Sequence, residues 1–368
     1  MESNDTSPTT PTHRAQYPSI SSDLPSPQPF RLLFGGVTAS DMDPGNLSKF
    51  HVLENDGHFS EEESELSNIR QSLGGLTKFT EMMKSGLAAV SLKISDLNPN
   101  VRLGATSQLS GFRLGKDTII TSAHFTKWPT TWEAFEALAR QYVSGEKGMF
   151  EARQERKIKQ SGVQFKTFDL KLVALHLPWD LAVFSIMTRP SGDDGNETIS
   201  QDQIMFVDQS HELSSYKDWW SVGYNSLHDE SPGTRNMIKQ QHRYNESIPP
   251  PMASFLKADR RTVSFGKIKY SQELREKASS CFINLSAWHG RSGGMVCSQA
   301  NGIVKVWGVV AGGNAERDPN TMVLFTEEMK EWFIAAVFER QDDLDKDYCE
   351  FLKCFVMSTS GVAATKEH

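Results

Sequence analysis

Short runs of β-branched and apolar residues, separated by turn residues, constrain the fold of this chain more than any other feature. They cover residues 86–94, 118–123, 172–186, 220–224, 263–268 and 306–313. Buried strands have this pattern, whereas a parallel α/β sheet needs helices that alternate regularly with its strands. The sequence contains no such alternation, so it favours an all-β fold with a few accessory helices.

One serine lies on a glycine-rich turn between two of these runs, at Gly290-Arg291-Ser292-Gly293-Gly294. Glycines let the backbone approach closely and leave the serine hydroxyl exposed beside backbone N–H groups. A nucleophilic serine needs this setting, because N–H donors must lie about 3 Å from the oxyanion that forms on the attacked carbonyl. The turn alone is a weak signal, since a serine is inert without a base and a group that orients the base.

One histidine and one aspartate have surroundings that suit these two roles. His124 follows the β-branched run 118–122, at the end of a predicted hairpin that begins at Ser110. Asp180 precedes the apolar run 181–186, where burial of a carboxylate is costly unless a partner hydrogen-bonds to it. A histidine ring N–H is a suitable partner, although a single histidine is more often structural.

The segments TSAH at 121–124, DLAV at 180–183 and GRSGG at 290–294 resemble the three triad motifs of the trypsin-like serine proteases. They occur in that family's order of His, Asp and Ser, and the resemblance covers about residues 85 to 340. It implies the chymotrypsin-like fold, a double six-stranded antiparallel β-barrel with a C-terminal helix. The distances between the motifs along the chain are long for the family but compatible with loop insertions.

The resemblance also implies an activity and the roles of the site residues. The chain would be a serine endopeptidase in which Ser292 attacks a peptide carbonyl, His124 transfers the proton and Asp180 orients the imidazole. The N–H groups of Gly290 and Ser292 would form the oxyanion hole. The partner is then a protein or peptide substrate, and neither a cofactor nor a metal is predicted.

Three further positions match the family's substrate pocket. Ser286 matches the pocket floor, so a preference for Lys or Arg is not supported. Gly313 matches a wall glycine that leaves the pocket open. Ala311 stands where the family usually has a serine that supports the triad aspartate, so that support is weakened.

Arg291 departs from the pattern of the secreted family members. It occupies the position of an aspartate that pairs with the new N-terminus after zymogen cleavage, so that activation switch cannot operate here. This favours a protease made in its active form. Two settings remain open for the Arg291 side chain: a pair with an acidic neighbour, or an exposed salt bridge of little energy.

Other functional classes are weighed against the protease. An α/β-hydrolase needs a histidine after its nucleophile, and only His368 follows Ser292. A housekeeping or chaperone-like protease of the HtrA type needs a C-terminal peptide-binding domain, for which the segment after Gln341 is too short. A catalytically silent trypsin-like domain that binds proteins remains the alternative, because geometry decides whether a triad is assembled.

Composition excludes two kinds of partner. The net charge is −7 with scattered basic residues, so a nucleic-acid partner is not suggested. No apolar run of about 18 residues is present, so no membrane span is expected. Residues 1–30 are rich in Ser, Thr and Pro and lack an apolar core, which is unlike a secretory signal. The expected location is therefore intracellular, in the cytoplasm or nucleus.

The cysteines agree with this location. Phe125 follows the predicted catalytic histidine where secreted relatives usually have a cysteine. Cys281 and Cys297 flank the serine turn on strands predicted to be neighbours, and we expect reduced core thiols there. Cys349 and Cys354 have no other metal ligands near them in sequence, so a zinc site is not predicted.

The predicted organisation is a disordered tail, a helical lead-in, the protease domain and an acidic C-terminal extension. A helical segment at 131–142 lies within an insert at 126–170, which either restricts substrate entry or is a plain excursion into solvent. The expected bounds are tail 1–58, lead-in 59–84, first barrel 85–188, interbarrel link 189–203, second barrel 204–325, closing helix 326–341 and extension 342–368.

Overall fold

The computed structural model describes most of the region between residues 50 and 337. The described residues are 50–59, 66–95, 106–124, 150–158, 162–176, 179–207, 213, 218–226, 257, 259–266, 268–269, 280–283, 285, 287–288, 290–312 and 320–337. The tail up to residue 49, the predicted helix 131–142 and the extension from 342 lie outside these ranges. Cys349 and Cys354 belong to this extension and therefore also lie outside the described residues.

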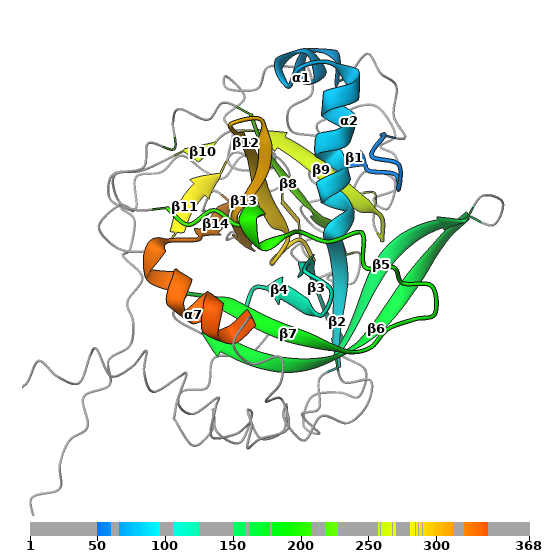
Figure 1. Cartoon of the computed structure of the whole chain (residues 1–368), viewed down its shortest axis with the longest axis vertical. Coiled ribbons are helices and arrows are strands. Elements are labelled where there is room, and N and C mark those ends of the chain that lie inside the picture. The colour runs from blue at the N-terminus through cyan, green and yellow to red at the C-terminus, as the bar shows by residue number, and fades with distance from the viewer. Residues whose placement is uncertain are drawn as a thin grey trace, which may run out of the picture.

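Six antiparallel strands close into a barrel in the first half of the described chain (Figure 1). Alternate residues of one strand, Val90, Leu92 and Ile94, enter the same apolar core, which is the period of two that a strand imposes. Each such buried side chain contributes about 1.5–3 kcal/mol. In barrel order the strands are β2 (Ala89–Ser95), β3 (Thr106–Leu114), β4 (Thr118–Thr121), β7 (Leu181–Thr188), β6 (Gly162–His176) and β5 (Phe150–Ile158).

The second half forms an antiparallel sheet of six strands with a two-residue strand at each edge. Both of its faces are covered: along one strand, Trp220 and Val222 enter one apolar cluster and Trp219 enters another. This explains why that strand is buried along its whole length. The order is β1 (His51–Val52), β9 (Arg261–Gly266), β8 (Trp219–Tyr224), β12 (Met295–Ala300), β13 (Ile303–Gly312), β14 (Thr321–Leu324), β11 (Ser280–Ile283) and β10 (Ile268–Lys269).

The predicted fold is thereby confirmed as mostly β, with a six-stranded barrel, a second antiparallel sheet and a C-terminal helix, a combination compatible with the chymotrypsin-like fold. The helix α7 (Glu327–Val337) buries one face as its spacing predicts. Its Trp332 ring packs edge-on against His176 and Trp179, which lie at the β6–β7 turn. The helix that follows the second sheet therefore anchors itself on the first barrel.

The prediction that the disordered tail extends to residue 58 is wrong for its last part. Residues 50–59 are ordered, and β1 pairs with β9 through His51 opposite Val263. Val52 and Leu53 are buried there. The sequence does not predict strand β1, because its partner strand lies more than 200 residues away and local composition carries no information about such a pairing.

Two α-helices and a 3₁₀ helix connect this N-terminal strand to the barrel. They are α1 (Ser67–Ser72), α2 (Leu76–Lys84) and η3 (Ser85–Ala88). Gly74 and Gly75 have φ values of 96° and 92°, so they end α1 as the sequence predicts for a left-handed glycine cap. The segment SEEE at 60–63 has the sequence pattern of a capping box, which predicts a helix start, but it lies outside the described residues.

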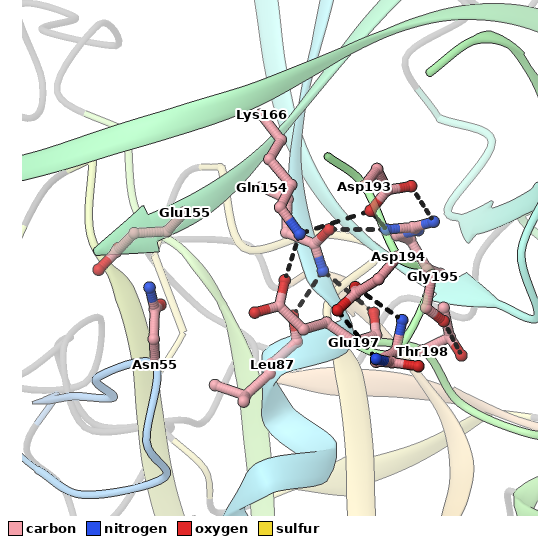
Figure 2. A network of polar contacts seen from close by, with 12 residues as sticks. Asn55, Leu87, Gln154, Glu155, Lys166, Asp193, Asp194, Gly195, Glu197 and Thr198 are labelled. Atoms are coloured by element: carbon pink, nitrogen blue, oxygen red, sulfur yellow. Dashed lines mark hydrogen bonds and ion pairs between the residues drawn. The ribbon is translucent and has the colours of Figure 1, made fainter. Parts of the chain in front are cut away.

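The segment that links the barrel to the second sheet is held by a buried polar network. Arg113 of β3 donates hydrogen bonds to both carboxylate oxygens of Asp193, at 3.0 and 2.9 Å, and the two side chains are 0% and 1% exposed. Lys166 of β6 also reaches Asp193 and forms an ion pair with Glu197 at 3.1 Å. Gln154 joins the group by donating to the carbonyls of Leu87 and Glu197 (Figure 2). Strands β3, β5 and β6 are thus connected to the link.

The cysteines near the serine turn are free thiols, but they are not on neighbouring strands. Cys281 lies on β11 and Cys297 on β12, and strands β13 and β14 separate them in the sheet. Both are buried, and burial raises the pKa of Cys281 to about 12 and raises that of Cys297 as well. The thiolate is the reactive form of cysteine, so neither side chain is activated for reaction at neutral pH.

This environment predicts a simple result. In a Cys349→Ser/Cys354→Ser variant, Ellman's reagent at pH 8 should react with neither remaining thiol while the protein is folded, and with both after denaturation. A measurement of released chromophore before and after guanidinium addition checks this. Rapid reaction in the folded protein would show that these thiols are accessible.

Candidate functional site

The predicted histidine and aspartate meet at one end of the first barrel. His124 Nδ1 lies 2.8 Å from Asp180 Oδ2, and the other carboxylate oxygen accepts the Ala123 N–H at 2.9 Å. A carboxylate only accepts hydrogen bonds, so Nδ1 carries the proton and donates it in this contact. In that tautomer the remaining ring nitrogen, Nε2, is the acceptor. The two side chains are 33% and 19% exposed, which leaves the ring accessible to a ligand.

The pairing of two barrel strands explains why these residues meet. In β4 and β7, Thr121 lies opposite Ala182, so the residues just after β4 face those just before β7. The Ala123 N–H also donates to the Asp180 carbonyl at 3.1 Å. Asp180 has a φ of 53°, in the left-handed region that aspartate tolerates better than most residues. The backbone turn thus aims the carboxylate back at His124.

His176 supports this turn from behind. Its ring stacks on that of Trp179 at a centroid distance of 3.7 Å, and its Nδ1 accepts the Trp179 N–H at 3.1 Å. Burial lowers the pKa of His176 to about 4, so the ring is neutral at physiological pH. A neutral ring fits an environment in which Nδ1 accepts a proton. We therefore assign His176 a structural role beside Asp180.

The serine turn leads into β12 and is shaped by two glycines. Gly290 and Gly293 have φ values of 87° and 82°, which a residue with a Cβ rarely adopts. The turn is closed by the Arg291 N–H to the Trp288 carbonyl and by the Gly294 N–H to the Arg291 carbonyl, both at 2.9 Å. Ser292 is half-buried, whereas its neighbours in the turn are buried. The only partly open side chain of the motif is thus the predicted nucleophile.

The serine turn packs directly on the strand end that leads to His124. A Cβ on Gly293 would overlap Thr121 Oγ1 and the Ser110 carbonyl and would lie 2.8 Å from the Ser122 nitrogen. The Ser110 N–H donates to the Ser292 carbonyl at 2.8 Å. The Ser292 turn therefore lies against residues 121–122, two positions before His124. Glycine at 293 is required by this close approach.

Backbone donors around Ser292 divide into occupied and open groups. The N–H groups of Arg291, Gly293 and Gly294 donate to backbone carbonyls, with Gly293 bound to Val310 of β13 at 2.7 Å. Within the described part of the chain, the N–H groups of Gly290 and Ser292 have no backbone acceptor. These are the two donors that the resemblance assigns to an oxyanion hole. Their availability is the property such a hole requires.

The surroundings of Arg291 match neither of the settings that the sequence left open, a pair with an acidic neighbour or an exposed salt bridge. Its side chain is fully buried, and it donates to Ser221 Oγ at 3.0 Å and Thr262 Oγ1 at 2.7 Å and to the carbonyls of both residues. Its guanidinium carbon lies 5.1 Å from the centre of the Phe50 ring. Among the described residues no carboxylate pairs with it, and burial lowers its pKa to about 9. The guanidinium can be buried without a carboxylate because β8 and β9 supply neutral hydroxyl and carbonyl acceptors for it.

The predicted substrate-pocket residues are only partly placed. Ala311 lies on β13 immediately after Val310, so that strand runs beside the serine turn. Its side chain is half-buried against the core. Ser286 and Gly313 lie outside the described residues.

Sequence reasoning missed two contributors, Ser110 and Thr121. Thr121 Oγ1 donates to the Ser110 carbonyl at 2.6 Å, and Ser110 in turn contacts the serine turn. Thr121 belongs to one of the motifs that carry the family resemblance and Ser110 begins the predicted hairpin before it, but their small polar side chains gave no separate signal. Only the packing of β3 and β4 against the serine turn gives them a role.

No protein-family model matches this chain, and no curated protein sequence matches it at a significant level. Within the described ranges, no group of three or more His, Cys, Asp or Glu side chains is arranged to hold a metal ion. None of the helices described is both long and apolar enough to cross a membrane. The site is therefore defined by its own geometry, with a His–Asp pair, a glycine-rich serine turn packed beside it and two N–H groups without a backbone acceptor among the described residues.

Proposed function

We propose that this protein is a serine endopeptidase that hydrolyses peptide bonds through an acyl-enzyme intermediate. The observation that carries the proposal is the 2.8 Å contact between His124 and Asp180, with the Ser292 turn packed against the residues that precede His124. A serine hydroxyl becomes a nucleophile when a base takes its proton and a third group orients that base. The contact would supply the orienting group, and the packing of the Ser292 turn on residues 121–122 supports a serine close to this base.

In the proposed reaction, Ser292 Oγ forms a bond to the substrate's carbonyl carbon while His124 Nε2 accepts the hydroxyl proton. The carbonyl oxygen becomes an oxyanion bound by the N–H groups of Gly290 and Ser292. Collapse of this intermediate breaks the peptide C–N bond, and His124 returns the proton to the leaving amine. Water, deprotonated by the same nitrogen, then attacks the ester carbonyl, the bond from this carbon to Ser292 Oγ breaks, and His124 returns the proton to Ser292. Asp180 holds the imidazole in the required tautomer throughout.

The surroundings of Arg291 support an enzyme that needs no cleaved N-terminus. The serine turn is already tied through this side chain to β8 and β9. Its charge is shielded by neutral acceptors and by the Phe50 ring rather than by a chain terminus. We propose that the turn adopts its working shape when the protein folds.

A fluorophosphonate probe, which phosphonylates activated serines, tests the proposal. We expect stoichiometric labelling at Ser292, located by peptide mass spectrometry, and no labelling of Ser292→Ala. Ser298→Ala is the matched control because it removes a buried serine hydroxyl of the same sheet, bonded to the Asp218 carbonyl at 2.8 Å. This control should label as the native protein does.

Peptide cleavage distinguishes an endopeptidase from another serine hydrolase. Incubation with a proteome-derived peptide library should produce new N-termini that depend on Ser292, and their flanking residues would define the specificity. A folded native protein that neither labels nor cleaves would instead be a trypsin-like domain that binds its partners without hydrolysing them.

A further inference from the structure

All three polar atoms of Ser110 contact the elements that build the site. Its N–H donates to the Ser292 carbonyl at 2.8 Å, and its carbonyl accepts from Thr121 Oγ1 at 2.6 Å. Its hydroxyl donates to the Gly290 carbonyl at 2.7 Å and accepts the Tyr224 N–H at 2.8 Å. Ser110 is fully buried on β3 of the first barrel, whereas Gly290 and Tyr224 belong to the second half of the chain. It thus connects the two halves at the serine turn.

The hydroxyl contact acts on one of the two residues assigned to the oxyanion hole. Gly290 has a φ of 87°, so nothing in its own side chain fixes the two peptide groups that flank it. The hydrogen bond from Ser110 fixes the peptide that follows Gly290. The Ser110 N–H fixes the carbonyl of Ser292, the other residue of the hole. Both predicted oxyanion donors are therefore in residues whose carbonyls bond to Ser110.

We propose that Ser110 is a positioning residue that sets the geometry of the oxyanion hole through the Gly290 carbonyl. This inference rests on the proposed serine-hydrolase function of the same site. The hydroxyl does not contact the oxyanion itself. It acts through the Gly290 backbone, whose positive φ fixes the N–H of this residue relative to the carbonyl that Ser110 holds.

The space around the Ser110 side chain shows how closely this contact is enclosed. A Cβ on Gly223 would lie 2.8 Å from Ser110 Oγ and 3.1 Å from its Cβ. A Cβ on Gly294 would lie 3.4 Å from the Ser110 Cβ. Glycines on β8 and on the serine turn thus leave room for a serine here. An added methyl group at 223 would push against the hydroxyl and, less closely, lie 3.3 Å from Arg291 Cγ.

The test measures how fast, and how completely, the fluorophosphonate probe labels Ser292. In Ser110→Ala, we expect the second-order rate constant to fall about 10-fold to 100-fold, since small misplacements of a reacting group cost this much. The fraction labelled at saturation should stay near one. The pH dependence of the rate should keep its native shape, because the hydroxyl is bonded to Gly290 and Tyr224 and not to His124.

A merely structural role would give a different pattern. Loss of stability would lower the fraction that can be labelled and the melting temperature, without slowing the labelling of the folded molecules. Ser298→Ala provides this comparison, since it deletes an equivalent buried hydroxyl-to-carbonyl bond away from the serine turn. It should label at the native rate.

A second variant reaches the same hydroxyl without deleting it. Gly223→Ala, at a position without a positive φ, should also slow labelling, and its effect should not add fully to that of Ser110→Ala. If Ser110→Ala fails to fold, the labelling rate of Gly223→Ala tests the inference instead. Labelling at the native rate in Ser110→Ala, or in Gly223→Ala alone if the first is unfolded, would overturn the inference. Absence of labelling in the folded native protein would instead refute the proposed function.

Discussion

Replacing Asp180 by asparagine is expected to lower the rate of peptide cleavage and of probe labelling about 10⁴-fold, while the protein stays folded. Asparagine tolerates the left-handed φ of 53° at this position, and its amide oxygen can still accept the Ala123 N–H. Its amide nitrogen then faces His124 Nδ1 and donates to it. The ring proton moves to Nε2, and that nitrogen can no longer take the proton of Ser292.

Asp194→Asn is the matched control for this change. Asp194 is an exposed acidic residue in the link between the barrel and the second sheet, so its replacement alters charge without touching His124. It should label at the native rate. Stopped-flow labelling near neutral pH and circular dichroism of both variants give the comparison. A native rate in folded Asp180→Asn would show that the His124–Asp180 contact does not support a catalytic base.

The largest expected effect on stability is that of Asp193→Ala. This change leaves Arg113 buried, with its guanidinium facing Gln154, the Lys116 carbonyl and an empty space in place of a carboxylate. Removing one partner of a buried ion pair costs about 3–5 kcal/mol, because the other charge stays out of water. Urea unfolding followed by tryptophan fluorescence should show a loss of this size. In Asp194→Ala, the exposed neighbour, the change should stay within about 0.5 kcal/mol.

The contribution of Asp193 to the free energy of unfolding should decrease as the pH falls. Burial alone would raise the pKa of Asp193, but the hydrogen bonds and charges of Arg113 and Lys166 outweigh it and hold that pKa below its ordinary value of 3.8. A carboxyl with a lowered folded-state pKa contributes stability that is present above the unfolded pKa and is lost as the pH falls through the folded one. The difference between native protein and Asp193→Ala should therefore be constant near neutral pH and shrink below about pH 4. A difference that grows on acidification would contradict this ion-pair role.

The sequence predicted the strands well where period and turn chemistry were strong. The run that became β7 and the apolar face of α7 follow from local patterns that a strand or a helix imposes on its neighbours. The left-handed glycines at 74 and 75 are another case, because a turn of this kind needs a residue without a Cβ. By contrast, β1 was assigned to a disordered tail, since two paired residues give too short a pattern.

At the site, too, some features follow from local sequence patterns and others only from long-range contacts. Order and context along the chain were enough to single out His124, Asp180 and Ser292, because each stands at the end of a strand-like run or on a glycine turn. The environment of Arg291 could not be read in this way. A charged side chain beside a turn is usually exposed, and only the pairing of β8 with β9 provides the buried hydroxyls and carbonyls that hold this one.

The sequence by itself determined the strand-rich character of this protein and singled out the three residues on which the proposed reaction depends. The tertiary structure decided that His124 bonds to Asp180, that Gly293 packs beneath Thr121, that Arg291 is buried among neutral acceptors, and that Ser110 ties the serine turn to the first barrel. The physical reason is distance along the chain. Periodicity and turn chemistry act over a few neighbouring residues, whereas these contacts join segments separated by 29 to 180 residues.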